Sequence, residues 1–427
     1  TTEIYTLSLH DALPILDLIV RPALYFVGKK DEKDNPDDYN RSDVGYFFYD
    51  FNVKVNHKFS EQSRLYLSVY DGKDKLFLNM NAKSEGSYNL DSDNNSPNPA
   101  FNTHHEINKN KTNFDTGWGT RMVSLNWAYA INNKLFSNVT LIYSRYSSDI
   151  VMKSSSEKEL TLSEENSDKI ERRVDKTKEN THYRSGIQDI GYRLEFDYTP
   201  VNNHFIRFGT SLLHHRFRPE QSGITLITEN DTEKRNDTVT FANERVLVKE
   251  LSFYAEDEMI LNERMKVNAG VHFSGFLVQG RSYISAQPRL SARYLLNNDW
   301  SVKVSYGKMN QYVHLLQSSK ISLPNDLWVP ITKNVKPMVS HQVSGGLFGR
   351  WRRFDLSLEG YYKSSRNQVE YREGTSLLSG NLNWEQRIAQ GLSKSYGVEM
   401  MASKTFGNTS GWLCYTLSWS NRHFPNG

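Results

Sequence analysis

Hydrophobic and polar side chains alternate with a period of two along most of the chain from residue 16 onward. Because successive side chains of a β-strand point to opposite faces, each alternating run predicts a strand with one apolar and one polar face. Apolar faces of this kind carry Val53 and Val55, Leu125 and Trp127, Phe253 and Ala255, Val302 and Val304, and Leu413 and Leu417. The pattern predicts about fifteen strands, most of them about 10–14 residues long.

The connections between these runs alternate between short and long. Short turns are expected at residues 60–62, 132–134, 200–204, 262–264, 297–299, 349–352 and 407–410. Long polar loops are expected at residues 29–43, 76–116, 149–185, 219–243, 311–340 and 366–391, with 280–285 as a short member of this second set. Such alternation places the long loops at one end of the sheet, as in outer-membrane barrels.

The length of the predicted strands favours a membrane-spanning sheet. A strand of about 11 residues that rises about 3.3 Å per residue and is tilted by about 40° spans about 28 Å, close to the apolar band of a transmembrane barrel. The soluble alternatives are a β-sandwich or a β-solenoid with inward-packed apolar faces, but sandwich strands are typically only about 5–6 residues long. Aromatic residues near strand ends, such as Trp127, Tyr198 and Trp300, also suit an interfacial girdle. We therefore predict an all-β protein, an antiparallel transmembrane β-barrel.

Composition agrees with this interpretation once the barrel is assumed. The chain has 427 residues, of which 37% are hydrophobic and 12% aromatic. A barrel tolerates such polarity because only every second strand residue meets lipid. No run approaches the roughly 18–20 apolar residues of a transmembrane helix. The net charge is only +3, with acidic and basic residues interspersed, so no basic stripe indicates nucleic-acid binding. The single cysteine, Cys414, excludes a disulfide framework and a cysteine-based zinc site.

The two ends of the chain lead to separate expectations. Residues 5–15, YTLSLHDALPI, resemble the translation of a sequencing adapter, so we expect residues 1–15 to be non-native and residues 16–427 to form the barrel. A spanning sheet must close, because open edges leave unpaired backbone groups in lipid, and bacterial barrels have even strand numbers. We therefore expect an incomplete barrel, with further strands beyond residue 427.

Several segments resemble the barrel of TonB-dependent outer-membrane receptors of the type with a carboxypeptidase-regulatory-like domain and a plug upstream. They include GYFFYDFNVKVNHKFSEQSRLYLSVYDGKDKL at 45–76, VSLNWAYAINNKLFSNVTLIYSRY at 123–146, HFIRFGTSLLHHRFRPE at 204–220, QPRLSARYLLNNDWSVKVSYGKMNQ at 287–311, LPNDLWVPITKNVKPMVSHQ at 323–342 and YGVEMMASKTFGNTSGWLCYTLSWSNRHFP at 396–425. The resemblance implies a barrel of about 22 strands around a plug. This chain would hold about fifteen of those strands and no plug.

The resemblance also implies a function and a location. Such receptors sit in the outer membrane of a Gram-negative bacterium, capture a scarce ligand at their extracellular loops and import it with energy transmitted by TonB. The implied partners are outer-membrane lipid, TonB through the plug region, and a siderophore, cobalamin or oligosaccharide as ligand. The alternatives are a passive porin-like channel and an outer-membrane enzyme. We predict no enzyme and no cofactor, because no catalytic triad, phosphate-binding loop or nucleophile elbow is present in the sequence.

Candidate ligand-contacting residues are aromatics in or beside the expected outer loops, where rings could stack on a sugar or an aromatic ligand. They are Tyr312, Trp328, Tyr371 and Trp384. Packing within the loops is the commoner role of such residues.

Metal binding is not predicted. The paired histidines His214 and His215 should point to opposite faces of a strand, and His104 and His105 lie in an expected loop without HExxH spacing. Acidic clusters at residues 31–38 and 91–93 could bind calcium, but a solvated loop is the default interpretation. Charges on the inward faces of the strands, such as Glu256 and Lys303, are expected to pair across strands or to contact a plug.

Overall fold

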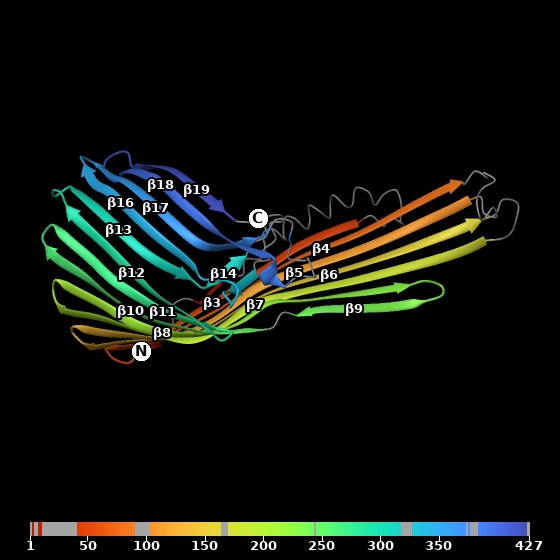
Figure 1. The fold of residues 1–427 in the computed structure, drawn as a ribbon, viewed down its shortest axis with the longest axis horizontal. Coiled ribbons are helices and arrows are strands. Elements are labelled where there is room, and N and C mark those ends of the chain that lie inside the picture. Colours follow the sequence, from red (N-terminus) through yellow and green to blue (C-terminus); the bar gives the residue numbers. More distant parts are fainter. Residues whose placement is uncertain are drawn as a thin grey trace.

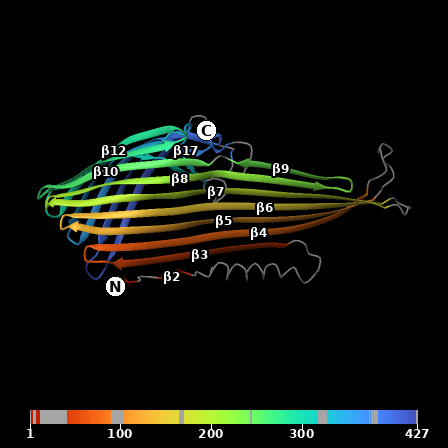
Figure 2. The ribbon, with the colours of Figure 1, turned by 90° about the horizontal axis from the view of Figure 1, so that it is seen from below.

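The computed structural model describes residues 2–3, 7–10, 41–89, 103–163, 170–242, 245–316, 327–372, 375 and 383–424. Nearly all of these residues belong to one antiparallel sheet, in which strands that follow one another in the chain pair as neighbours. The sheet curves into a trough with the short turns at one end, and several of its strands extend far beyond the other end (Figures 1 and 2). In this part of the chain no helix is long and apolar enough to cross a membrane.

The strands have the following bounds. The first half contains β1 (Thr2–Glu3), β2 (Leu7–His10), β3 (Arg41–Lys58), β4 (Ser63–Asn89), β5 (Thr103–Asn132), β6 (Leu135–Ser163), β7 (Ile170–Val201), β8 (His204–Glu229) and β9 (Lys234–Ala242). The second half contains β10 (Val246–Asn262), β11 (Met265–Val278), β12 (Arg281–Leu295), β13 (Trp300–Gln311), β14 (Val313–Leu316), β15 (Leu327–Pro330), β16 (Met338–Trp351), β17 (Phe354–Tyr371), the short 3-10 helix η1 (Trp384–Gln386), β18 (Ile388–Lys404) and β19 (Gly411–His423).

The apolar face of the sheet lies on its convex, outer side. Leu141, Phe253 and Val304 keep 50%, 52% and 53% of their surface exposed, which is the arrangement expected of side chains that face lipid. The opposite face is polar: Arg207 pairs with Glu256 at 2.9 Å, and the Tyr254 hydroxyl donates to Glu195 at 3.1 Å. The predicted all-β fold, with oil-facing and water-facing residues alternating, is therefore confirmed, as is cross-strand pairing at Glu256.

Within the described residues, the sheet does not close on itself. The last strand, β19, pairs with β18, and β3 pairs with β4 and with the short β1 and β2. The predicted partial barrel is thus observed as an open, curved sheet. The first part of the alternating pattern, from residue 16 to residue 40, lies outside the described residues.

The short turns lie where the sequence predicts them, and asparagine side chains stabilise several of them. The Asn132 side-chain oxygen accepts hydrogen bonds from the backbone N–H of Lys134 and Leu135, at 2.8 and 3.0 Å. Asn297 does the same for Asp299 and Trp300, at 2.9 Å each. This is the local bonding that makes asparagine a strong turn former.

The long polar stretches differ from the prediction. Residues 76–89, 103–116, 149–163 and 170–185 are not loops but continuations of β4, β5, β6 and β7. Beyond the residues next to the belt, such as Leu78, Ile150 and Tyr183, these extensions are mostly polar, so the regular alternation that marks a membrane strand is missing. Cross-strand ion pairs connect them instead, such as Lys158 with Glu106 at 3.1 Å and Lys176 with Glu157 at 3.3 Å. Residues 221–229 of β8 and the strand β9 form a similar polar hairpin.

Candidate functional site

Two segments fold inward onto the concave side of the sheet, at the end opposite the short turns. The first mouth segment comprises residues 312–316 and 327–337, between β13 and β16, and it contains the hairpin of β14 and β15. The second mouth segment comprises residues 383–390, which include η1 and the first residues of β18. Strand β15 contacts β7 and β8, whereas β14 contacts β17, so the hairpin stands between opposite sides of the trough (Figure 1).

A first apolar cluster fixes the hairpin to the wall of the trough. It is formed by Ile150, Tyr183, Leu316, Leu327, Val329, Val335, Val369, Trp384 and Ile388, all of them buried. Side chains along β14 and β15 point alternately to the two faces of the hairpin. The buried face carries His314, Leu316, Leu327 and Val329. Burial of this many apolar groups orders a segment that the sequence suggested to be a loop.

A second apolar cluster lies beside the first and holds the start and the end of the first mouth segment. Tyr312 and Ile331 pack against Phe217, Val248 and Phe276 of the wall. The rings of Phe276 and Tyr312 are stacked with their centroids 4.9 Å apart. Because these wall residues point inward while their neighbours face lipid, the second cluster lies inside the trough.

Buried hydrogen bonds align the first mouth segment with β11 and β12. The Tyr312 hydroxyl lies 2.6 Å from the Ser274 hydroxyl, which also accepts from the Gln287 side-chain amide at 2.7 Å. The Gln287 oxygen in turn accepts from the backbone N–H of Asn310 at 3.0 Å. The Tyr283 hydroxyl donates to the carbonyl of Thr332 at 2.8 Å. These bonds satisfy polar groups that burial would otherwise penalise.

The second mouth segment is anchored by a buried ion pair. The guanidinium of Arg387, with 0% of its side chain exposed, donates to the carboxylate of Glu220 on β8, which is 5% exposed. The two mouth segments also bond to one another, through Asn334 with Glu385 at 2.5 Å and through Gln390 with the backbone carbonyl of Lys336 at 2.9 Å. The mouth is therefore one hydrogen-bonded unit tied to β8 on one side and to β17 and β18 on the other.

The aromatics singled out from the sequence all lie at this mouth. Tyr312 and Trp384 are 5% and 2% exposed and belong to the two clusters. Trp328 is half-buried and pairs with Leu315 on the hairpin face opposite the buried one. Tyr371 is half-buried and packs at the edge of the first cluster. The fold thus brings together residues that are up to 72 positions apart in the sequence, and ligand contact by them stays a prediction.

Histidines on the inner wall form no metal site. His215 is buried, with Nδ1 2.8 Å from Asp189 and Nε2 3.3 Å from Glu250, whereas its neighbour His214 lies on the outward face. His105 contacts Ser87 at 2.8 Å and Glu85 at 3.2 Å, in a strand rather than a loop. Among the described residues no group of His, Cys, Asp and Glu is arranged to hold a metal ion. The acidic clusters at residues 31–38 and 91–93 lie outside the described residues.

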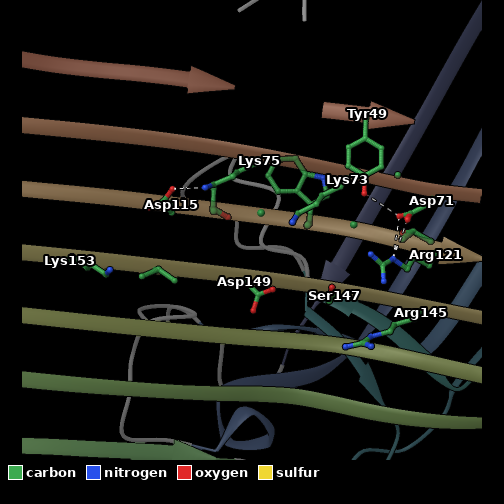
Figure 3. Close-up of a pocket in the computed structure, with 17 residues that line it drawn as sticks. Tyr49, Asp71, Lys73, Lys75, Asp115, Arg121, Arg145, Ser147, Asp149 and Lys153 are labelled. Carbon is green, nitrogen blue, oxygen red and sulfur yellow. Dashed lines mark hydrogen bonds and ion pairs between the residues drawn. The ribbon is translucent and has the colours of Figure 1, made fainter. Parts of the chain in front are cut away.

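A hollow of about 510 Å³ on β3 to β6 is a second candidate site (Figure 3). Two ion pairs lie within its lining: Arg121 lies 3.3 Å from Asp71, and Lys75 lies 3.2 Å from Asp115. Arg121 is in register with Arg145, two positions from the lipid-facing Val123. This hollow therefore opens on the outward face of the sheet and is no part of the lumen.

Sequence reasoning missed Glu220, Arg387, Gln287 and Ser274. A single charged or polar residue carries no local signal of its burial, because the partner that makes burial acceptable is distant in the sequence. The only hint is the break in alternation at Pro219 and Glu220.

Comparison with known proteins gives a match to one protein family. The model of the family described as "TonB dependent receptor-like, beta-barrel" matches residues 68–424. Nothing matches among the curated proteins. Similar solved structures include the ferric-catecholate import receptor Fiu from E. coli, at 11% identity and a TM-score of 0.45, over 90% of this chain and 64% of that one. The FrpB iron transporter from Neisseria meningitidis shares 10% identity at a TM-score of 0.42, over 90% and 61%. The ferripyoverdine receptor of Pseudomonas aeruginosa shares 11% at 0.44, over 89% and 55%. The chain spans less than two thirds of the length of these proteins.

Proposed function

Since the chain belongs to the TonB-dependent receptor-like β-barrel family, we propose that it captures a scarce ligand outside the cell and imports it with energy transmitted by TonB. The observation that carries the proposal is the family match over residues 68–424. The family resides in the outer membrane of Gram-negative bacteria, and its members are receptors and transporters rather than enzymes.

The orientation follows from the lengths of the connections. In outer-membrane barrels the short turns face the periplasm and the long segments face the cell exterior. The mouth segments and the extensions of β4 to β7 then lie on the extracellular side. A ligand arriving from outside meets the mouth before it reaches the polar inner wall.

The mouth supports a capture role for particular residues. Trp328 and Leu315 share the hairpin face that is turned away from the first apolar cluster, and Trp328 keeps part of its ring exposed. An exposed indole can stack on the ring of a sugar or of an aromatic chelator. Trp328 is the residue for which we propose direct ligand contact, and Tyr371, half-buried at the edge of the first cluster, is a second candidate. Tyr312 and Trp384 are buried in the two apolar clusters, and they support the mouth segments instead of contacting the ligand.

The second part of the proposal concerns the energy source of import and the ligand. TonB would act through a plug inside the lumen, and the ligand would be a siderophore, cobalamin or an oligosaccharide, molecules too large for simple diffusion. The barrel then needs no covalent chemistry, because import depends on binding outside and on release inside.

Uptake measurements in whole cells test this function. The full-length gene is expressed in a strain deleted for its own receptors, and uptake of labelled ferric siderophores, cobalamin and oligosaccharides is followed with and without a functional tonB gene. We expect one ligand class to bind in both strains and to be imported only in the strain with TonB. Import of a ligand at equal rates in both strains would mean a passive channel and would overturn the proposal.

A point variant tests the capture residue. Trp328→Ala should weaken binding of the imported ligand by about tenfold, since stacking on one aromatic side chain contributes about 1–1.5 kcal/mol. The matched control is Trp419→Ala, which removes the same side chain from the outward face of β19, where it is 46% exposed. Binding measured on cells should be unchanged in the control, and equal losses in the two variants would exclude a specific role for Trp328.

A further inference from the structure

On β6, β7, β13, β17 and β18 the outward face changes from an apolar to a polar residue at the extracellular edge of the apolar belt. Outward apolar positions at this edge of the belt are Tyr143, Ile190, Tyr306, Tyr362 and Tyr396 on five of the strands. The next outward positions, two residues further toward the extracellular end, are Arg145, Gln188, Lys308, Ser364 and Lys394. Aromatic girdles mark the membrane–water interface of such barrels, so these polar positions lie at the level of the lipid headgroups.

On β6 to β10 this level holds a basic concavity that we name the arginine hollow. It has a volume of about 220 Å³. Its charged lining consists of Arg145 on β6, Arg216 and Arg218 on β8, and Arg245 just before β10. Arg145 is in register with Gln188 and Gln188 with Arg216, which places the two arginine backbones about 10 Å apart.

The backbone forms the floor of the arginine hollow. Gly186 on β7 lies between Ser147 and Arg218 in the register, and a Cβ atom there would come within 2.6 Å of the Tyr146 carbonyl oxygen. Gly186 therefore leaves the space between Ser147 and Arg218 without a side chain from β7, next to the outward Gln188. The hollow also lies where β8 changes partner, because Phe217 pairs with Val246 of β10 whereas Gln221 pairs with Ala242 of β9.

The charge of the arginine hollow has no counterpart in the part of the chain that the structure describes. No carboxylate of the described residues forms an ion pair with Arg145, Arg216, Arg218 or Arg245, and no acidic residue lines the hollow. The neighbouring hollow on β3 to β6 differs, since Asp71 and Asp115 pair with its basic residues. Clustered guanidinium groups repel one another unless an anion lies between them.

We propose that the arginine hollow binds the phosphate groups of a phosphorylated glycolipid in the outer leaflet of the membrane. The planar guanidinium fork matches phosphate oxygens and makes charge-assisted hydrogen bonds with them. The position of the hollow selects the lipid: it opens outward, directly above the apolar belt, so that a headgroup phosphate reaches it while the acyl chains lie on Tyr143 and Ile190. Basic pockets at the membrane surface bind anionic headgroups in this way.

Native mass spectrometry of the full-length receptor in detergent tests the proposal. The probes are lipid A with two phosphates, the same lipid after enzymatic dephosphorylation, and inorganic phosphate as competitor. The test variant is Arg216→Gln/Arg218→Gln. The control is Lys308→Gln/Lys394→Gln, which removes two charges from the same level on the other side of the trough. Heat-modifiable mobility in gel electrophoresis verifies that each variant is folded.

The expected result is tight binding of the phosphorylated lipid, at least tenfold weaker binding of the dephosphorylated lipid, and a loss of about tenfold or more in the arginine variant only. Three outcomes would overturn the proposal: equal binding of both lipids, equal losses in both variants, or complete competition by inorganic phosphate at low millimolar concentration. The last outcome would identify a site for a free anion. None of these outcomes bears on TonB-dependent uptake, so the two proposals fail independently.

Discussion

Single residues hold the mouth segments against the wall of the trough. Several of the polar groups involved are deeply buried. The ion pair of Glu220 with Arg387 connects β8 to the second mouth segment. His314 lies on the buried face of β14. Changes at such positions affect docking of the mouth segments much more than they affect the sheet itself, because the strands keep their own hydrogen bonds.

Removal of Arg387 should release the second mouth segment. Arg387→Met leaves the carboxylate of Glu220 buried without this ion-pair partner, which should cost about 3–5 kcal/mol. Hydrogen exchange of the backbone amides of residues 383–390 should become much faster. The double variant Glu220→Leu/Arg387→Met should restore most of the protection, since an apolar pair can replace a buried ion pair. A double variant as unprotected as the single one would contradict this explanation.

Docking of the β14–β15 hairpin should depend on pH through His314. Burial lowers the pKa of the His314 imidazole to about 4, whereas a solvated histidine has a pKa of about 6.5. The undocked hairpin therefore takes up a proton between these two values and the docked one does not. Docking is fully stable above pH about 6.5 and weakens as the pH falls toward 4.

A fluorophore measures this pH dependence. Lys333→Cys, labelled in a Cys414→Ser background, reports on the position of the first mouth segment, because Lys333 is exposed and Cys414 is the only native cysteine. The signal should change as the pH falls from 7 to 4, and His314→Leu should abolish the change. A variant with an unaltered pH profile would show that another group controls docking.

At the scale of the strand, alternation decides which substitutions the barrel tolerates. Adjacent residues of one strand face lipid and lumen, so two neighbouring substitutions of the same kind experience different solvents. Leu141 and Ile142 on β6 illustrate this, since Leu141 is 50% exposed on the outward face and Ile142 is half-buried on the inner face.

Arginine at these two positions should have unequal effects. Leu141→Arg places a charge in the apolar belt and should destabilise the folded barrel by about 2–4 kcal/mol. Ile142→Arg points into the polar lumen and should cost clearly less. Urea titrations of folding into lipid vesicles, read by heat-modifiable mobility, compare the two. The reverse order would mean that the outward face does not meet lipid.

At the scale of the whole molecule, the belt-level sheet and the polar extensions are stabilised by different forces. The sheet buries its outward face in lipid and its upper inner face under the mouth segments. The extensions of β5 to β7 are connected mainly by backbone hydrogen bonds and exposed ion pairs, such as Arg172 with Glu159 at 2.7 Å. Exposed pairs contribute only about 0–1 kcal/mol each and are screened by salt.

Shortening the extensions should therefore leave the barrel intact. Deletion of residues 156–177, with β6 and β7 joined by an Asn-Gly turn, removes paired strand but none of the mouth clusters. The free energy of unfolding, measured by urea titration, should change by no more than about 0.5 kcal/mol. A large loss of stability would show that the extensions support the mouth.

Local patterning in the sequence was sufficient to predict the belt-level parts of the described strands, their faces, the short turns and the membrane-spanning character. The physical reason is that solvent acts on each residue separately: lipid outside and water inside impose a period of two at Leu125 and Trp127 as at Val302 and Val304. The family resemblance drawn from the same residues is confirmed by the match over residues 68–424.

Tertiary structure alone decided the features that depend on distant partners. The extensions of β4 to β7 have no regular apolar alternation, and they are strands because neighbouring strands supply hydrogen bonds and opposite charges. The mouth segments fold inward because Leu327 and Trp384 find Ile150 and Tyr183 on the wall. The arginine hollow exists because β6 and β8 bring Arg145 and Arg216 to one level on either side of β7. Contacts across so many residues leave no local pattern, so only the folded chain reveals them.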